Sequence, residues 1–266
     1  MQLILGFIFG ALIGFLAYRA RALSLSGALG ATLTGGLIFG LGGIPWAVLL
    51  LTFFISSSGL SRAFARNKST LGEKFSKGSQ RDIGQVLANG GLGALLAVAY
   101  AIFPDQDWSW IAFAGAMAAV NADTWATEVG VLSRRPPRLI TNGRVVERGA
   151  SGAVSLVGYL AALAGAALIG LGAVLFSPRP WTWEMVLVLA LGGLAGSTFD
   201  SFLGATVQAI YYCPQCQKET ERHPFHLCGV PTSLVRGWPW LNNDLVNFFC
   251  SLVGAGAALV VASLLS

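Results

Sequence analysis

The sequence predicts an all-α, polytopic membrane protein with about seven to eight transmembrane helices in a single domain, residues 1–266. Three observations lead to this prediction. The chain is 55% hydrophobic and only 11% charged, and its mean hydropathy is +0.67, which is typical of helical membrane proteins. It contains 34 glycines, many at spacings that favour close helix packing in lipid. Its apolar runs are long enough to cross a hydrocarbon core of about 30 Å.

Eight apolar runs define the expected helices. They cover residues 2–18, 26–42, 44–59, 85–103, 109–127, 151–176, 183–210 and 244–264. The second and third runs are short and separated only by Gly43-Ile44-Pro45, so they form either two crossings or a re-entrant pair. No basic residue precedes the first run, which is the opposite of a cleaved signal peptide, and we expect a retained helix there.

The basic residues predict the orientation in the membrane. With eight spans, 16 of the 17 Lys and Arg residues fall in loops on one side, and only Arg179 falls on the other. Loops rich in Lys and Arg face the cytoplasm, so both termini are expected outside. A Cys/His-rich loop at residues 211–242 is then cytoplasmic. This placement accounts for the net charge of +5, so we expect the lipid bilayer and no nucleic acid as a partner.

Polar side chains interrupt the apolar runs near their predicted cytoplasmic ends. A charge at the bilayer centre costs about 2.5–3.5 kcal/mol, so ionisable groups in such runs indicate function. The clearest stretch, residues 121–128, carries Asn121, Asp123, Thr124 and Glu128. Other runs carry Arg81, Gln85 and Asn89 at helical spacing, Ser197, Asp200 and Ser201, and Asn243, Asp244 and Asn247. Asp200 is expected two or three turns inside its helix. Any single amide or hydroxyl could instead serve only as a hydrogen bond between helices.

Carboxylates and amides without neighbouring Cys or His suit Mg²⁺ in company with substrate phosphates. We expect Asp123, Glu128 and Asp200 to hold Mg²⁺, with Asp244 as an alternative ligand. Asn121 and Arg81 would act with them in catalysis. The residues expected to bind substrate or nucleotide are Gln85, Asn89, Thr124, Arg138, Thr141, Ser197, Ser201, Asn243, Asp244 and Asn247. Such a site suits phosphoryl or nucleotidyl transfer to a lipid anchored in the bilayer.

The loop before the sixth run offers a second way to hold phosphate. It contains Gly143, Gly149 and Gly152 beside Thr141, Asn142 and Ser151. Backbone amides of such a loop can bind an anion near the start of the following helix. A plain turn with an Asn-Gly corner explains the same residues equally well, because the loop lacks a Gly-Lys-Ser/Thr phosphate-binding motif.

Three of the four cysteines cluster with both histidines. Cys213, Cys216, His226 and Cys228 have the spacing of a tetrahedral zinc site, with His223 as a less favoured fourth ligand. A cytoplasmic location argues against a disulfide. We expect a structural Zn²⁺, with metal-free thiols as the alternative, and we expect Cys250 to pack in the core.

Several stretches of the chain resemble a family of integral membrane proteins that includes plant phytyl-phosphate kinase. They are Arg81-Asp-Ile-Gly-Gln-Val-Leu-Ala-Asn-Gly-Gly, Asn121-Ala-Asp-Thr-Trp-Ala-Thr-Glu-Val-Gly, Pro137-Arg-Leu-Ile-Thr, Gly196-Ser-Thr-Phe-Asp-Ser-Phe-Leu-Gly-Ala-Thr and Trp240-Leu-Asn-Asn-Asp-Leu-Val-Asn. The resemblance covers about residues 60–255. It implies transfer of a phosphoryl group from a nucleoside triphosphate, CTP in the plant case, to an isoprenoid monophosphate. The family is also distantly similar to dolichol and phytol kinases and to CTP-dependent lipid cytidylyltransferases.

Three other functions are open at this point. A cytidylyltransferase acting on a lipid phosphate needs the same metal and lipid groove, but it releases pyrophosphate. A transporter would use the acids as an ion path near the bilayer midplane, often between repeats. Here no repeat is visible and the acids cluster at one face. A structural scaffold has no need of charge in lipid. We therefore expect an integral membrane kinase whose active site faces the cytoplasm.

Overall fold

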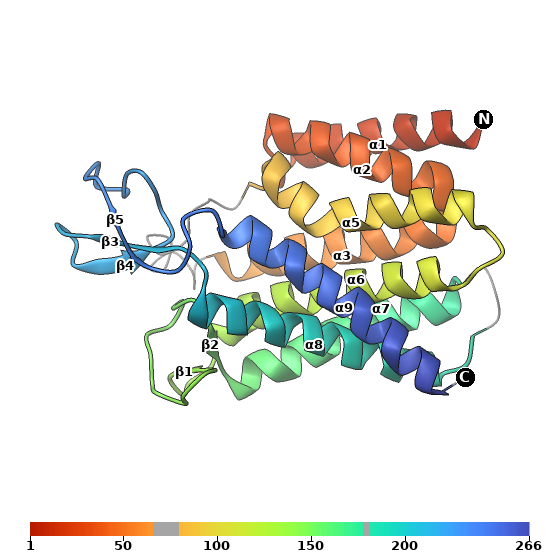
Figure 1. The fold of residues 1–266 in the computed structure, drawn as a ribbon. Coiled ribbons are helices and arrows are strands. Elements are labelled where there is room, and N and C mark those ends of the chain that lie inside the picture. Colours follow the sequence, from red (N-terminus) through yellow and green to blue (C-terminus); the bar gives the residue numbers. More distant parts are fainter. Residues whose placement is uncertain (66–79, 178–180, 266) are drawn as a thin grey trace.

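A computed structural model describes residues 1–65, 80–177 and 181–265. Eight helices lie in this part of the chain and run roughly side by side, with both chain ends at the same end of the bundle (Figure 1). They are α1 (Gln2–Arg19), α2 (Leu25–Gly42), α3 (Ile44–Ala63), α5 (Ile83–Ile102), α6 (Trp108–Gly130), α7 (Leu156–Leu175), α8 (Glu184–Thr206) and α9 (Asn243–Leu265). The predicted all-α membrane bundle is confirmed.

Seven of these helices, all except α6, are long and apolar enough to cross a membrane. At 1.5 Å per residue, α2 and α3 are each about 27–30 Å long. They are joined at Gly43, which has a φ of +78°, and Pro45 lies in the first turn of α3. The second and third runs are therefore two full-length helices rather than a short re-entrant pair.

Helix α6 lies at the centre of the bundle. Every residue from 112 to 122 is buried, and α6 packs against α3, α5, α7, α8 and α9. Small residues let these helices approach closely. A Cβ on Gly196 of α8 would lie 2.5 Å from Cβ of Ala119 and 2.7 Å from the carbonyl oxygen of Cys250. Helix α8 is wedged between α6 and α9 here. The polar residues that lie one or two turns from this contact, toward the end of the bundle opposite the chain termini, are therefore brought together.

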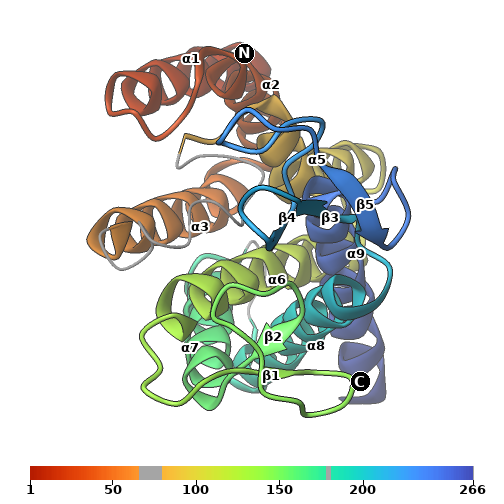
Figure 2. The ribbon, with the colours of Figure 1, turned by 90° about the vertical axis from the view of Figure 1, so that its left-hand side faces the viewer.

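Two small antiparallel sheets, which the sequence did not predict, lie at the end of the bundle opposite the termini (Figures 1 and 2). In one, β1 (Arg138–Leu139) pairs with β2 (Ala153–Val154). In the other, β3 (Ile210–Cys213) lies between β4 (Lys218–Thr220) and β5 (Ser233–Arg236). We call this end of the bundle the sheet end.

The sheet end also carries the positive charge. Within the described residues, every Lys and Arg lies in or beside a connection at this end. Arg66, Lys68, Lys74, Lys77 and Arg179, which also entered the sequence-based topology, lie outside the described residues. The opposite connection between α5 and α6 contains Asp105 and Asp107. Among the described residues, the basic connections therefore lie at one end of the bundle and this acidic connection at the other, which agrees with the predicted distribution of Lys and Arg.

Three helix boundaries differ from the prediction in ways that affect the site. Helix α8 ends at Thr206 because the apolar residues that follow enter β3. Helix α7 begins at Leu156, after β2, with Ser155 capping it through the backbone N–H of Gly158. Helix α5 begins after Asp82, which forms a capping box with Gln85. Arg81 therefore precedes the helix instead of sharing a helical stripe with Gln85.

Candidate functional site: a polar cavity at the sheet end

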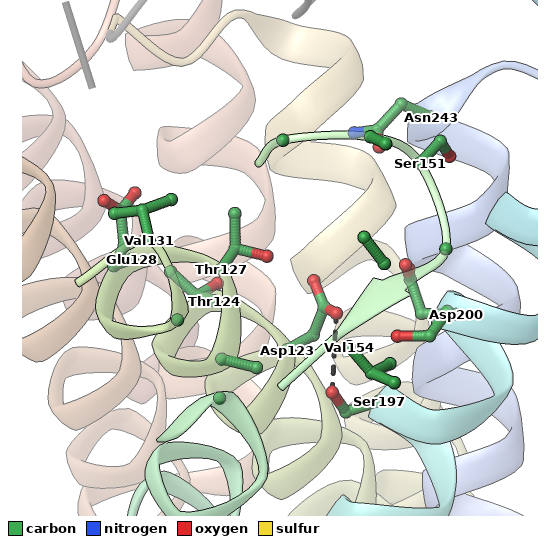
Figure 3. A pocket seen from close by; sticks show the side chains of 18 of the residues that line it. Asp123, Thr124, Thr127, Glu128, Val131, Ser151, Val154, Ser197, Asp200 and Asn243 are labelled. Atoms are coloured by element: carbon green, nitrogen blue, oxygen red, sulfur yellow. Dashed lines mark hydrogen bonds between the residues drawn. The ribbon is translucent and has the colours of Figure 1, made fainter. Parts of the chain in front are cut away.

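A cavity of about 830 Å³ opens at the sheet end of the bundle. Its walls come from α3, α5, α6, α8 and α9, from the segment 148–155, and from the loop that carries the second sheet. Elements far apart in the sequence therefore contribute to one space (Figure 3). The size is in the range of sites for small molecules and cofactors.

Asp123 and Asp200 form the acidic centre of this cavity. They come from α6 and α8, and Figure 3 shows both carboxylates directed toward the space between the two helices. Oδ1 of Asp123 is 3.5 Å from the hydroxyl of Ser197. Among the described residues, no donor reaches the buried Oδ2 of Asp200. A buried carboxylate oxygen without a donor is well suited to a cation, because cation binding offsets its desolvation.

Asp200 lies less deeply than predicted. It is six residues from the last residue of α8, which is about 9 Å or less than two turns. Asp123 is seven residues from the end of α6. The two carboxylates therefore lie at a similar depth, as two ligands of one ion require.

Glu128 lines the same cavity but lies apart from the aspartate pair. Its Oε1 accepts a 2.7 Å hydrogen bond from Ser61 of α3. Glu128 follows Asp123 by five positions, which turns the two side chains about 140° apart on a helix. Among the described residues, the carboxylates do not form a closed three-residue metal cluster. The three carboxylates predicted to hold Mg²⁺ therefore do not lie together, and only Asp123 and Asp200 face the same part of the cavity.

Arg81 is held where α2, α3 and α5 meet. Its backbone pairs with Ala22 and Ser24, and its guanidinium donates to Ser57 at 2.9 Å. The guanidinium also lies 5.3 Å from the ring centre of Phe53. Burial lowers the pKa of Arg81 to about 10, and the charge of Glu128 opposes that shift. Arg81 thus remains a cation at neutral pH and faces the cavity.

Most of the predicted binding residues line the cavity. These are Gln85, Asn89, Thr124, Ser197, Ser201, Asn243 and Asn247. Some of their polar atoms are also used within helices. Asn89 donates to the carbonyl of Gln85, and Thr124 donates to the carbonyl of Val120. Asp244 is half-buried at the first turn of α9 and is not among the lining residues.

Asn121 lies outside the cavity, contrary to the catalytic role predicted for it. It is fully buried, donates to the carbonyl of Gly165 at 2.7 Å and accepts from Ser56 at 3.0 Å. Two residues along a helix from Asp123, it points to nearly the opposite side. Its amide joins α3, α6 and α7, which is the structural alternative considered for such residues.

The loop before α7 divides into two halves with different roles. Thr141 is exposed, and Asn142 and Gly143 form a turn in which the Asn142 side chain accepts from the Arg144 backbone. Arg138 donates to the carbonyl of Gly143 and does not line the cavity. For this half, the plain Asn-Gly turn is correct and the phosphate-binding prediction is not supported.

The second half of the loop forms a wall of the cavity. Gly149, Ser151 and Gly152 line it, together with the start of α7. Gly152 has a φ of +78°, and a Cβ there would lie 2.4 Å from the backbone nitrogen of Ala205. Only glycine fits this crossing of the loop over α8. The loop backbone is therefore fixed close to Asp200.

Several lining residues had no clear signal in the sequence: Ser61 and Tyr159, which belong to α3 and α7, and Arg148, Gln208, Glu221 and Arg222, which lie in loops. Gln208 is buried, accepts from Ser151 at 2.9 Å and donates to Glu221 at 2.9 Å. It therefore ties the loop before α7 to the loop that bears β4. Arg148 and Arg222 add positive charge to the cavity wall.

The Cys/His loop brings four metal-ligand atoms together. One ligand atom from each of Cys213, Cys216, His226 and Cys228 lies within 4.8 Å of the others. Adjacent pairs are 3.3–3.5 Å apart. A tetrahedral Zn²⁺ with bonds of about 2.0–2.3 Å places its ligands roughly 3.5–3.8 Å apart, so the set fits zinc. His223 instead stacks on Tyr211, which agrees with the preference for His226.

The loop that carries the cluster also reaches the cavity. Burial raises the pKa of the Cys213 thiol, but hydrogen bonds from the Cys216 backbone and the Cys228 side chain, among others, lower it below its usual value overall. The Cys228 side chain and burial instead raise the pKa of Cys216 to about 11. Leu227 lies between two of the ligands and lines the cavity, as do Glu221 and Arg222. The loop that carries the cluster therefore forms part of the cavity wall, and we call this part, Glu221, Arg222 and Leu227, the roof of the site.

The fold and the cavity together define a polytopic membrane protein with a mixed acidic and basic site at one end of its helices. The chain belongs to the family described as integral membrane protein DUF92, which it matches over residues 8–255. The membership inferred from the sequence motifs is thereby confirmed.

Named relatives come from plants, archaea and cyanobacteria. The chain is 34% identical to Protein PGR of Arabidopsis thaliana over 95% of this chain and 93% of that protein. It is 37% identical to an uncharacterized membrane protein of Methanocaldococcus jannaschii over 70% of this chain and 75% of the other. It is 28% identical to an uncharacterized membrane protein of Synechocystis over 82% and 77%, respectively. No solved structure matches the chain.

Proposed function

We propose that this protein is a membrane kinase that transfers a phosphoryl group from a nucleoside triphosphate, CTP above others, to an isoprenoid monophosphate. One observation carries the proposal: a single cavity at the end of the helix bundle contains the Asp123 and Asp200 carboxylates together with Arg81, Arg148 and Arg222. Phosphoryl transfer needs this combination, because catalysis consists mainly of positioning and charge stabilisation. The family resemblance supplies the acceptor and the preference for CTP.

The aspartate pair fits Mg²⁺. Mg²⁺ usually takes one or two carboxylates and completes its shell with water and substrate phosphates. Asp123 and the donor-free Oδ2 of Asp200 supply two such ligands from opposite helices. These two carboxylates would hold the ion, whose charge would offset the negative charge of the phosphates during transfer.

The reaction needs no strong base from the protein. The acceptor monophosphate is already ionised, so one of its oxygens can attack the terminal phosphorus of the nucleotide directly. A new P–O bond forms, the bond to the nucleoside diphosphate breaks, and the products are an isoprenoid diphosphate and that diphosphate. Arg81 would hold the acceptor phosphate, and Arg148 and Arg222 would hold the nucleotide phosphates.

We also propose that the sheet end faces the cytoplasm and that the Cys213, Cys216, His226 and Cys228 cluster holds a structural Zn²⁺. The basic connections support the orientation. The donor set and its spacing support the metal. In this arrangement the nucleotide enters from the cytoplasm beneath the zinc-held roof.

A screen of nucleotides and acceptors tests the proposed activity. The purified protein in detergent is incubated with Mg²⁺, a mixture of nucleoside triphosphates and prenyl monophosphates of several lengths, and the products are analysed by mass spectrometry. The proposal predicts prenyl diphosphate and a nucleoside diphosphate. A CDP-linked lipid with pyrophosphate would instead identify the cytidylyltransferase, which uses the same kind of site. No product from any pair would reject both.

A further inference from the structure

A second cavity, apolar and about 300 Å³ in volume, adjoins the polar one. It lies among α1, α2, α3 and α5, and we call it the α3 groove. Its walls include Leu23, Phe39, Val48, Leu51 and Phe54. Figure 2 looks along the bundle from the sheet end and shows α3 set apart from α1 and α2. The exposed side chains of Phe9 and Ile44 lie at its border, so the groove reaches the lipid-facing surface.

The α3 groove and the polar cavity share three lining residues, Arg81, Gln85 and Asn89. Beyond them the polar character ends abruptly. Thr34 is the other polar side chain of the groove, and its hydroxyl is bonded to the carbonyl of Gly30 at 2.9 Å. The two cavities thus meet at Arg81, Gln85 and Asn89, and the lining changes there from charged to hydrocarbon-like. A molecule that occupies both has an anionic head and an apolar chain.

The geometry points to the α3 groove as the binding site for the isoprenoid chain of the acceptor, with its phosphate beside Arg81. This inference rests on the proposed function for the identity of the acceptor. Because the chain comes from the bilayer, it exchanges one hydrocarbon environment for another in the groove, and the phosphate beside Arg81 anchors it there. The guanidinium, anchored by Ser57 and Phe53, is fixed at the level where head and chain join.

The length of the groove sets how much of the chain it can hold. Its α3 wall runs from Ile44 to Phe54, which is ten residues or about 15 Å. That is about half of a hydrocarbon core of about 30 Å. The part of a long isoprenoid nearest the phosphate would lie in the groove, and the remainder would extend into the bilayer. The acceptor would thus enter sideways from lipid, while the nucleotide enters from the sheet end.

Filling the groove tests this placement. A Cβ on Gly35, which lines the groove, would have its nearest neighbours at 4.0 Å, the Cα of Gly10 and Cδ2 of Leu50, so Gly35→Leu can be introduced without a clash at its Cβ. The matched control is Gly256→Leu on the exposed face of α9, where nothing lies within 4 Å. We expect Gly35→Leu to lower kcat/KM for a twenty-carbon prenyl monophosphate about tenfold or more. A five-carbon acceptor should be affected less than about threefold, and the control variant should match the wild type with both.

A binding measurement separates the groove from the kinase activity. A prenyl monophosphate with a photoreactive diazirine in its first isoprene units is irradiated with the wild-type protein in nanodiscs, without nucleotide. Crosslinks on α2, α3 and α5 that a phosphate-bearing competitor removes, but the matching prenyl alcohol does not, support the groove even if no nucleotide is used. Crosslinks elsewhere, or equal competition by the alcohol, would show that bulk lipid alone occupies it and would overturn the inference. If the protein is an active kinase but the crosslinks lie elsewhere, the proposed function stands and only the groove is rejected.

Discussion

The hydroxyl of Ser197 on α8 lies 3.5 Å from Oδ1 of Asp123 on α6. Ser197 lies one helical turn before Asp200 on the same helix. This contact aligns the two helices so that their carboxylates face one space at nearly equal depth (Figure 3). The alignment depends on Gly196, which allows α8 to approach Ala119 on α6. The acidic pair at the centre of the site is thus a product of close helix packing.

Asp200→Asn should abolish activity and leave the fold intact. The substitution keeps the shape of the side chain but removes a charge that an ion or a developing phosphoryl group would use. We expect kcat to fall by about 100-fold or more. The melting temperature should stay the same or rise, because a carboxylate that repels Asp123 is lost. Asp105→Asn, in the exposed connection at the opposite end, serves as the control. Full activity in Asp200→Asn would remove Asp200 from the mechanism.

The pH profile should report the burial of Arg81. Burial lowers a basic pKa, and that of Arg81 falls to about 10, so the wild type should keep its phosphate-binding charge until the pH approaches 10. A lysine starts from a pKa of about 10.4, so the same burial should move its proton loss down by roughly two pH units. In Arg81→Lys, kcat/KM should therefore decline from mildly alkaline pH. Identical alkaline limits in the two proteins would show that this charge does not bind substrate.

Gly152→Ala should disturb the cavity wall, whereas Gly143→Ala in the same loop should not. Both glycines have a positive φ, so each alanine carries a similar backbone cost of about 1–2 kcal/mol. Only at Gly152 would the new Cβ strike a neighbour, the Ala205 backbone at 2.4 Å. We expect an additional loss of stability and at least about a tenfold loss of kcat/KM in Gly152→Ala. Equal activity in the two variants would contradict a role for this wall.

Asn121→Ala should reduce stability more than catalysis. It removes two buried hydrogen bonds, to Ser56 and Gly165, and should cost about 1–3 kcal/mol of unfolding free energy. Activity per folded molecule should remain within about threefold of the wild type. The comparison requires thermal unfolding and turnover measured on the same detergent preparation. A stable but inactive variant would restore the catalytic role that the sequence had predicted.

The purified protein should contain one zinc ion per chain, measured by elemental analysis. His226→Ala and Cys216→Ser should each lose it, because they remove ligands. His223→Ala should keep it, since His223 stacks on Tyr211 outside the cluster. Replacement by Co²⁺ should produce the absorption of a thiolate-ligated tetrahedral centre. We also expect chelation to weaken nucleotide binding, because Glu221 and Arg222 lie in the roof that the cluster holds. Wild-type protein purified without metal and unable to take up Zn²⁺ or Co²⁺ would reject the site.

The sequence predicted the helices well because each is an apolar run of membrane-spanning length. It misplaced the end of α8 because an apolar strand of the second sheet follows the helix, and composition alone does not distinguish the two. Asp123 and Asp200 were found because charge in an apolar run is costly. Asn121, a polar but uncharged residue of the same run, was selected with them but points away, since helix rotation and packing partners decide its direction. Arg148, Gln208 and Arg222 were missed because loop residues reach the cavity only through the tertiary fold.

The central claim is that the Asp123 and Asp200 pair supports phosphoryl transfer to a lipid phosphate. The most direct measurement uses CTP labelled separately at its α and γ phosphates, with Mg²⁺, a prenyl monophosphate and the purified protein. The account predicts that the γ label alone enters the lipid product, and that Asp200→Asn prevents the transfer. Entry of the α label, or folded wild-type protein that moves neither label from any nucleoside triphosphate tested, would contradict it.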